Sequence, residues 1–418
     1  MERFEFPIRI LTPIWTAGPS QKPNGLKMSG VMGGMRQCFE MLIRKHAGHT
    51  CNITGPAEQR CKYEGDIHDI CPACAVFGCT GLQRSFKVLM GDVSTVHVVF
   101  PETDRYRPNR NHNNISYTKS GNPATPSIDT WLATVIRGGE TINPANHEQA
   151  REILNSLKPS YSKNATMQVI GLRKWHSEVP LRELLIYLLA FMSKYSGLGA
   201  KIMQGWGQFR LESTLDISFA REQDIFQECI SEQNYEHNGL DVSLLNGEDC
   251  FSEEYIVNDS RLGFNWPRGE KYDSFFKCGG FGLQYALRRR IKFLEVEPAG
   301  STPASPPCLL PITDSNWRNI THGEPWDRVP WNKSIAFTRA LFGQDEAEET
   351  KRAGLIGVSH AYSEGHTTKI KFFGCIPQNG YFYRQNEVNL SWDRESVVEF
   401  IIRQFRDELT MRRVMEED

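Results

Sequence analysis

The chain has 418 residues, of which 39% are hydrophobic and 23% charged, and its formal net charge is −2. This length exceeds the usual size of one domain and predicts two. No apolar run approaches the roughly 18 residues that span a bilayer. The first ten residues alternate like a strand and lack a secretory signal, so we expect a cytoplasmic protein with no membrane partner.

The charge is distributed unevenly along the chain. Residues 1–211 hold 25 Lys and Arg against 16 Asp and Glu, whereas residues 212–259 hold one basic side chain against 13 acidic ones. A polyanion would be attracted to the first half and repelled from the middle. The acidic middle is interpreted as a solvated connecting face or as a dock for a basic partner subunit.

The first half predicts a strand–helix–strand–strand–helix–strand order. Apolar residues alternate from Phe4 to Ile10 and then recur at helical spacing over residues 29–46. A strand-like stretch follows at 86–100, a second helix begins after Pro180, and a short strand contains Phe209 and Leu211. This order is that of a ferredoxin-like βαββαβ unit.

The second half shows similar ingredients. It contains helical patterns at 281–293 and 394–413, a Pro/Ala/Ser linker at 298–307 and a strand at 369–376. We therefore divide the chain into residues 1–215, an acidic connecting segment 216–250 and a second unit 251–418. Within the first unit, residues 101–127 form a long polar insertion whose Arg105, Arg107 and Arg110 have no assigned role.

A glycine-rich turn separates the second helix from the short strand. Glycine lets backbone N–H groups approach phosphate oxygens, and a basic side chain and an aromatic face would add charge and base stacking. The alternative is a plain tight connection. The turn spans residues 197–207 and contains Gly197, Gly199, Gly205 and Gly207, with Lys201, Gln204 and Trp206 among them.

The start of the first helix is a second candidate for anion binding. Helix N-termini carry unpaired N–H donors and partial positive charge. Lys27 and Arg36 lie at this start, and Arg44 lies further along the helix. The alternative is a glycine-softened helix start with solvated basic residues.

Five of the eleven cysteines lie between Cys51 and Cys79. In a cytoplasmic protein, clustered cysteines indicate metal binding more often than disulfides. Four thiolates hold zinc tetrahedrally, and a closed site of this kind is structural. We predict a zinc-stapled loop over residues 46–81, with His46, His49, His68 or Cys79 as possible replacements for a ligand, and the predicted ligands are Cys51, Cys61, Cys71 and Cys74.

Four motifs occur in an order that resembles a known family: TPIWTAG, SGVMGGMRQCFEML, CPACAVFGCTGLQRSFKV and GLGAKIMQGWGQFRL. They are similar to the repeat-associated mysterious protein (RAMP) superfamily, and within it to the family of first subunits of the Cmr complex, the type III-B CRISPR effector. The motifs cover about a quarter of the chain.

The resemblance implies an α+β protein with two tandem ferredoxin-like (RRM-like) domains. It also implies a non-catalytic subunit of an antiviral ribonucleoprotein that contacts the 3′ region of a CRISPR guide RNA and the complementary target RNA, beside other RAMP subunits. The RNA-binding residues expected on this basis are Trp15, Lys27, Arg36, Arg44, Arg84, Lys201, Gln204 and Trp206.

Two other functions remain open. One is a metal-independent endoribonuclease that processes CRISPR RNA, for which His46, His49 and His68 would supply acid–base groups. The other is a scaffold that contacts only protein, which the acidic segment favours. Salt-dependent RNA binding separates these functions, because phosphate contacts weaken as salt rises.

Overall fold

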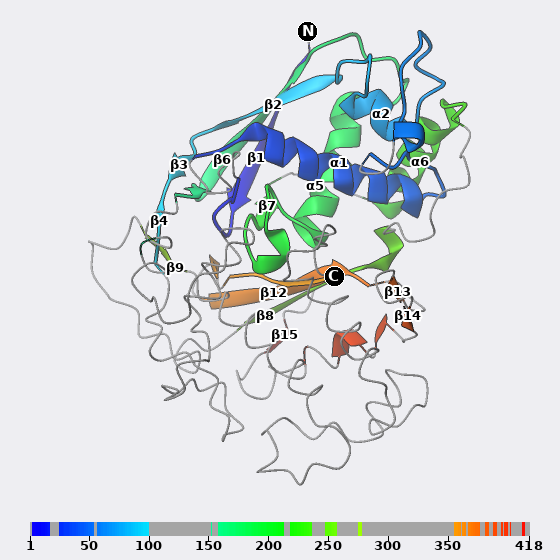
Figure 1. Cartoon of the computed structure of the whole chain (residues 1–418). Helices are drawn as coiled ribbons and strands as arrows, with labels where there is room; N and C mark the ends of the chain where they lie inside the picture. The colour runs from blue at the N-terminus through cyan, green and yellow to red at the C-terminus, as the bar shows by residue number, and fades with distance from the viewer. Residues whose placement is uncertain are drawn as a thin grey trace.

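The structure is a computed structural model of the whole chain. Figure 1 shows a first sheet with helices packed against it, and a second group of strands beside them. The residues that it describes are 2–16, 25–53, 57–99, 152, 158–212, 218–235, 247–256, 275–277, 355–360, 362–364, 367–376, 381–383, 388–390, 394–395, 397–399, 402 and 412–413. The predicted insertion 101–127, the helix 281–293 and the linker 298–307 lie outside the described residues.

The first unit is built on a four-stranded antiparallel sheet. The strand order is β2-β6-β1-β7, in which β1 pairs with both β6 and β7 and β2 pairs with β6. The strands are β1 (Arg3–Ile10), β2 (Phe86–Gly91), β6 (Asn164–Gly171) and β7 (Phe209–Leu211). With α1 (Met28–Lys45) and α5 (Leu181–Tyr195), they follow the predicted strand–helix–strand–strand–helix–strand order.

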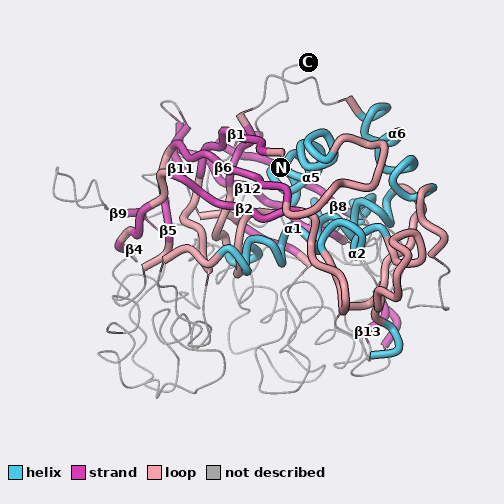
Figure 2. Tube along the Cα trace, turned by 90° about the horizontal axis from the view of Figure 1, so that it is seen from above, coloured by secondary structure: helices cyan, strands magenta, loops and turns pink. Residues whose placement is uncertain are grey.

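The alternating pattern of β1 explains how the core forms. Phe6, Ile8 and Ile10 point to the helices and are buried, while Glu5 and Pro7 on the other face are exposed. α5 begins directly after Pro180 and buries nine of its fifteen residues. Apolar burial on one face of the sheet and along one stripe of each helix gives the first unit its single core. Figure 2 shows α5 beside the strands β1, β2 and β6 of the first sheet.

The acidic segment contains a helix that the sequence interpretation missed. α6 (Phe219–Ser231) begins at Ser218, whose side chain accepts a hydrogen bond from the Arg221 N–H. Its Ile225, Phe226 and Cys229 are buried in the core of the first unit. Part of the segment expected to be a connector therefore packs with the first unit.

The second group of strands also forms an antiparallel sheet. Its order is β10-β12-β8-β15, with β11 paired to β12. A disulfide joins Cys250 of β8 to Cys375 of β12, which face each other across the pair. The predicted strand 369–376 corresponds to β12, but the predicted helix 394–413 does not reach its expected end, because Arg412–Arg413 is strand β15. The strands are β8 (Cys250–Ile256), β10 (Ile356–Val358), β11 (Tyr362–Glu364), β12 (Thr367–Cys375) and β15 (Arg412–Arg413).

Short elements complete the described chain. The predicted strand-like stretch 86–100 is broken into β2, β3 and β4, of which β3 pairs with β5 and β4 pairs in parallel with β9. These elements are η1 (Ala57–Gln59), α2 (Pro72–Phe77), β3 (Ser94–Thr95), β4 (His97–Val99), β5 (Ser160–Tyr161), η3 (Ile202–Gln204), η4 (Gly247–Asp249), β9 (Phe275–Lys277), β13 (Tyr381–Tyr383) and β14 (Val388–Leu390).

The chain is thus a mixed α/β protein with antiparallel sheets. The tandem ferredoxin-like arrangement and the boundaries 1–215, 216–250 and 251–418 stay predictions. Within the described ranges, no helix is both long enough and apolar enough to cross a bilayer.

Candidate functional site

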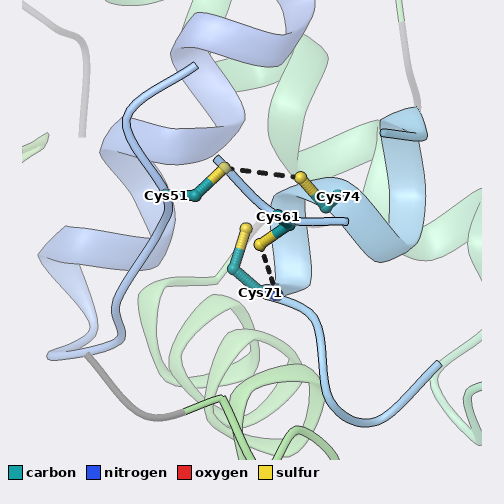
Figure 3. Close-up of side chains that lie close together, drawn as sticks. All are labelled: Cys51, Cys61, Cys71 and Cys74. Carbon is teal, nitrogen blue, oxygen red and sulfur yellow. Dashed lines mark hydrogen bonds between the residues drawn. The ribbon is translucent and has the colours of Figure 1, made fainter. Parts of the chain in front are cut away.

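The four cysteines predicted as metal ligands converge in the structure. Their Sγ atoms all lie within 4.8 Å of one another, and all four residues are buried. Figure 3 shows the four sulfurs pointing toward one another, with Cys74 on α2 and the other three on the loop that leads to it. Cys51 and Cys61, which lie far from a CxxC pair in the sequence, are brought to Cys71 and Cys74 by the fold of this loop.

The donor set fits a zinc ion. Zinc bound tetrahedrally to thiolates at about 2.3 Å places its sulfurs roughly 3.8 Å apart. The Sγ atoms of Cys51 and Cys74 are 3.5 Å apart and the four cysteines are free thiols. Four soft, buried sulfur donors favour Zn²⁺ over Mg²⁺ or Ca²⁺, which prefer oxygen.

The thiols are also coupled electrostatically. Hydrogen bonds from Cys61, Cys71 and Cys74 lower the pKa of Cys51, while contact with Cys51 raises the pKa of Cys74. Deprotonation of all four thiols needs a cation among them.

The possible replacement ligands are not part of the four-sulfur group, although Cys79 lies beside it and its side chain hydrogen-bonds to that of Cys74. His46 is buried, with its Nε2 atom 3.1 Å from Glu222 Oε1 on α6. The Nδ1 atom of His68 is 2.6 Å from the Glu232 carbonyl oxygen. Cys79 Sγ donates to the Thr80 carbonyl oxygen at 3.7 Å, and neither Cys79 nor His49 belongs to the four-sulfur group.

The glycine-rich turn lies against the end of β1 and the start of α1. The Ala200 N–H donates to the Trp15 carbonyl oxygen at 2.7 Å, and the Gly207 N–H donates to the Pro13 carbonyl oxygen at 2.9 Å. A Cβ added to Gly34 of α1 would lie 3.5 Å from the Gly199 carbonyl oxygen. Three motifs that are far apart in the sequence therefore meet at one place, which we call the junction: residues 12–16, 27–34 and 197–207.

The glycines of the turn are required by close backbone packing. A Cβ on Gly207 would lie 1.9 Å from the Leu198 carbonyl oxygen, and one on Gly205 would lie 2.6 Å from the His360 nitrogen. The N–H groups of Leu198, Ala200, Gln204, Gly205 and Gly207 all donate to protein carbonyl oxygens. The tight-connection interpretation therefore accounts for these glycines, and five N–H groups of the expected phosphate cradle are already used.

Trp15 and Trp206, both expected to contact RNA, lie inside the protein. Trp15 and Trp206 are both 0% exposed, and their ring centroids are 4.9 Å apart. Trp206 also packs edge-on against His360, at 4.5 Å between ring centroids. Neither ring offers a face to a base, because each is enclosed by the protein.

Arg36 and Arg44 also face the protein instead of an RNA surface. The Arg36 side chain is 11% exposed, and its Nη2 donates to Cys74 Sγ at 3.0 Å. Burial alone would lower the pKa of Arg36, but the charge of Cys74 and the hydrogen bond and charge of Glu40 raise it. Arg44 donates from Nη1 to Thr50 Oγ1 at 2.7 Å. The donors of Arg36 are thus engaged by the cysteine loop and by Glu40, and its RNA contact stays a prediction.

The other four residues expected to contact RNA differ in their exposure to solvent. Lys27 and Arg84 are exposed, whereas Lys201 and Gln204 are half-buried. The Nζ atom of Lys201 lies 5.6 Å from the centroid of the Trp15 ring, and the backbone of Lys201 is left-handed with φ of 56°. Lys27 and Lys201 thus belong to the junction, while Arg84 follows the cysteine loop, beside Gly78.

The described residues define a mixed α/β protein with antiparallel sheets and a buried four-cysteine group. No protein-family model matches the chain, and no curated protein matches its sequence. Its structure is similar to that of Cmr1 from Pyrococcus furiosus in the apo form, at 11% identity and a TM-score of 0.41, over 99% of this chain and 98% of that chain.

The structure is also similar to a chain of the Type III-B Cmr-beta bound to cognate target RNA and AMPPnP in the presence of ssDNA. That similarity has 9% identity and a TM-score of 0.40, over 97% of this chain and 99% of that chain. A second Cmr-beta structure, bound to cognate target RNA, gives 11% identity and a TM-score of 0.37, over 97% and 99% of the two chains. These structures are of the kind that the sequence motifs resemble. At such identities and TM-scores, no residue's role follows from the similarity.

Proposed function

We propose that this protein is a non-catalytic RNA-binding subunit of a type III-B CRISPR ribonucleoprotein, built on tandem ferredoxin-like domains, and that its RNA lies at the junction. The observation that carries the proposal is the convergence there of three sequence motifs. The end of β1, the start of α1 and the glycine-rich turn meet through the Trp15–Ala200 and Pro13–Gly207 hydrogen bonds.

The junction has the charge that a phosphate backbone needs. Lys27 is exposed and is the N-cap residue of α1, which has no side-chain cap and no acidic residue in its first turn. A helix start of this kind attracts anions. Lys201 adds a second ammonium group from the turn. A subunit that accepts any guide sequence needs such contacts to the backbone more than it needs contacts to base edges.

The cysteine loop has a structural role in this proposal. Zinc held by Cys51, Cys61, Cys71 and Cys74 would have no open coordination position for a substrate. The metal would instead fix the loop that follows α1 and carries α2. Guide RNA, target RNA and neighbouring RAMP subunits are the partners that we propose.

The positions of two of the three histidines argue against the ribonuclease alternative, while His49 is exposed. His46 is buried beside Glu222, and His68 contacts the Glu232 carbonyl oxygen. General acid–base cleavage needs such groups within reach of the RNA. Cleavage of RNA in EDTA that His49→Ala abolishes would establish the nuclease and overturn the non-catalytic role.

The proposal is tested by salt-dependent RNA binding to the full chain, alone and with its neighbouring subunits. We expect single-stranded RNA to bind with an affinity that falls steeply with salt in fluorescence polarisation. Lys27→Ala and Lys201→Ala should each weaken binding and reduce the slope of log K against log salt by about 1, because each removes one phosphate contact.

A matched control comes from the opposite end of the sheet. Arg3 of β1 pairs with Ile170 of β6, so residues after β6 lie far from the junction, which follows the other end of β1. Lys174 is exposed there, and Lys174→Ala should leave both affinity and slope unchanged. Salt-insensitive binding, or an equal effect of Lys174→Ala, would contradict the junction as the RNA site. If the protein assembles with its neighbouring subunits but binds no RNA, the scaffold alternative is favoured.

A further inference from the structure

The Arg36 side chain reaches the four-cysteine group directly. Its Nη2 donates to Cys74 Sγ at 3.0 Å and lies 3.9 Å from Cys51 Sγ. Its Nη1 donates to the Gly78 carbonyl oxygen at 2.7 Å, just after α2. Its Nε donates to Glu40 Oε1, one turn along α1, at 2.9 Å.

These contacts fix the guanidinium plane against the sulfurs. Glu40 holds one edge of the group from α1, and Gly78 holds another from the end of α2. The Arg36 and Glu40 side chains are only 11% and 12% exposed. Water therefore screens the charge of Arg36 weakly, and the charge acts mainly on the sulfurs beside it.

The metal-bound form of the group needs such a cation. Four thiolates around one divalent ion carry a formal charge of roughly −2. A buried charge of this size is costly unless it is paired or hydrogen-bonded. A charge-assisted N–H···S bond supplies both kinds of stabilisation at once.

We propose that Arg36 is a positioning residue of a metal centre formed by Cys51, Cys61, Cys71 and Cys74, where it donates to the Cys74 thiolate and offsets the negative charge. This inference rests on the zinc proposed above. It replaces the RNA contact expected for Arg36 from the sequence. It also gives α1 a direct link to the metal, through one side chain in the middle of the helix.

The test compares zinc retention in the wild-type chain, Arg36→Met and Arg36→Lys. Met keeps the apolar stem and removes both charge and donors, while Lys keeps the charge and loses the planar fork. Zinc content is measured by elemental analysis, and affinity by competition with a chelating dye. We expect Arg36→Met to lower zinc affinity about 10- to 100-fold, as for other outer-shell partners, and Arg36→Lys to lower it less.

Cobalt substitution supplies a readout that a merely structural arginine would not change. A hydrogen bond withdraws electron density from sulfur and raises the energy of the thiolate-to-cobalt charge-transfer band. Arg36→Met should therefore shift this band to longer wavelength in the folded Co²⁺ form. Circular dichroism of each variant checks that the fold is retained, and Arg36→Lys keeps the test usable if Arg36→Met does not fold.

The control is Lys62→Gln. Lys62 is adjacent to Cys61 in the chain, but its side chain is 69% exposed and pairs with Glu64 in solvent. It should leave zinc affinity and the cobalt band unchanged. Wild-type protein that binds no zinc would overturn the metal centre itself. Wild-type protein that binds zinc, with an unchanged affinity and band in Arg36→Met, would overturn the role of Arg36 alone.

Discussion

Gly207 lies where its own backbone packs closely against that of Leu198, and it adopts a φ of 68°. This left-handed region strains any residue with a Cβ. Gly33 of α1 is the opposite case, because it is exposed and a Cβ there would meet nothing within 4 Å. The same residue type is therefore essential at one position and dispensable at the other.

At the residue scale, Gly207→Ala should destabilise the protein by about 3 kcal/mol or more, from backbone strain and the clash with the Leu198 carbonyl oxygen. Gly33→Ala should stabilise it by about 0.5–1 kcal/mol, because alanine is the better helix former. Chemical denaturation measures both values. Equal unfolding midpoints for Gly207→Ala and wild type would show that the turn can rearrange.

At the element scale, the cysteine loop joins α1, α2 and α6. The Asn234 N–H, just after α6, donates to the His68 carbonyl oxygen at 2.7 Å, while Arg36 of α1 contacts Cys74 of α2. The described part of the loop has little regular structure of its own, and its helices are the single turn η1 and the short α2. A metal at its centre would therefore supply much of its folding free energy.

Removal of metal should consequently loosen this loop before the rest of the unit. We expect a chelator to lower the thermal midpoint and to increase hydrogen exchange in peptides covering residues 46–85. Cys74→Ser should reproduce both effects without chelator. Cys79→Ser should retain zinc, because Cys79 lies outside the four-sulfur group; zinc loss in that variant would mean that the ligand set is different.

At the scale of the whole molecule, the two sheets meet through a buried polar contact. Lys371 of β12 is 2% exposed, and its Nζ donates to the Ser193 carbonyl oxygen at 2.7 Å and to Gln208 Oε1 at 3.2 Å. Arg210 of β7 pairs with Glu364 at 2.7 Å and with Glu254 at 2.6 Å. The residues that follow the glycine-rich turn are thus bound to the second sheet.

The contact should make stability depend on pH. Burial lowers the pKa of Lys371 to about 7, an effect that Arg210 and Lys194 reinforce and Glu254 opposes. In the unfolded chain the pKa is about 10.4, so between these values the unfolded state binds more protons and stability rises with pH. The full effect is on the order of 3–5 kcal/mol.

Denaturation of wild type and Lys371→Met from pH 6 to 10 measures this dependence. The difference in the free energy of unfolding between wild type and Lys371→Met should change over this pH range. The other titrating groups are common to both chains, so their contributions cancel in this difference. The methionine side chain cannot bind a proton, so the stability of Lys371→Met should rise less with pH than that of wild type. Parallel profiles would show that Lys371 keeps an ordinary pKa in the folded protein.

Much of the first unit could be predicted from local sequence patterns. Alternation from Phe4 to Ile10 and helical spacing after Ser29 predict β1 and α1 to within about one residue, because each pattern places its apolar face against a core. α6 was missed because its acidic surface residues conceal a short apolar stripe of Ile225, Phe226 and Cys229. The break of residues 86–100 into three strands depends on pairing partners that the local sequence does not specify.

The sequence by itself determined β1, α1, α5 and the identity of the four clustered cysteines, because periodicity and residue chemistry are local properties. Only the tertiary structure decided what the basic and aromatic residues contact. Arg36, Trp15 and Trp206 have the composition of an RNA site, but they are enclosed by chain segments that are distant in sequence. Burial depends on these long-range contacts, so the structure leaves Lys27 exposed at the junction and turns Arg36 toward the cysteines.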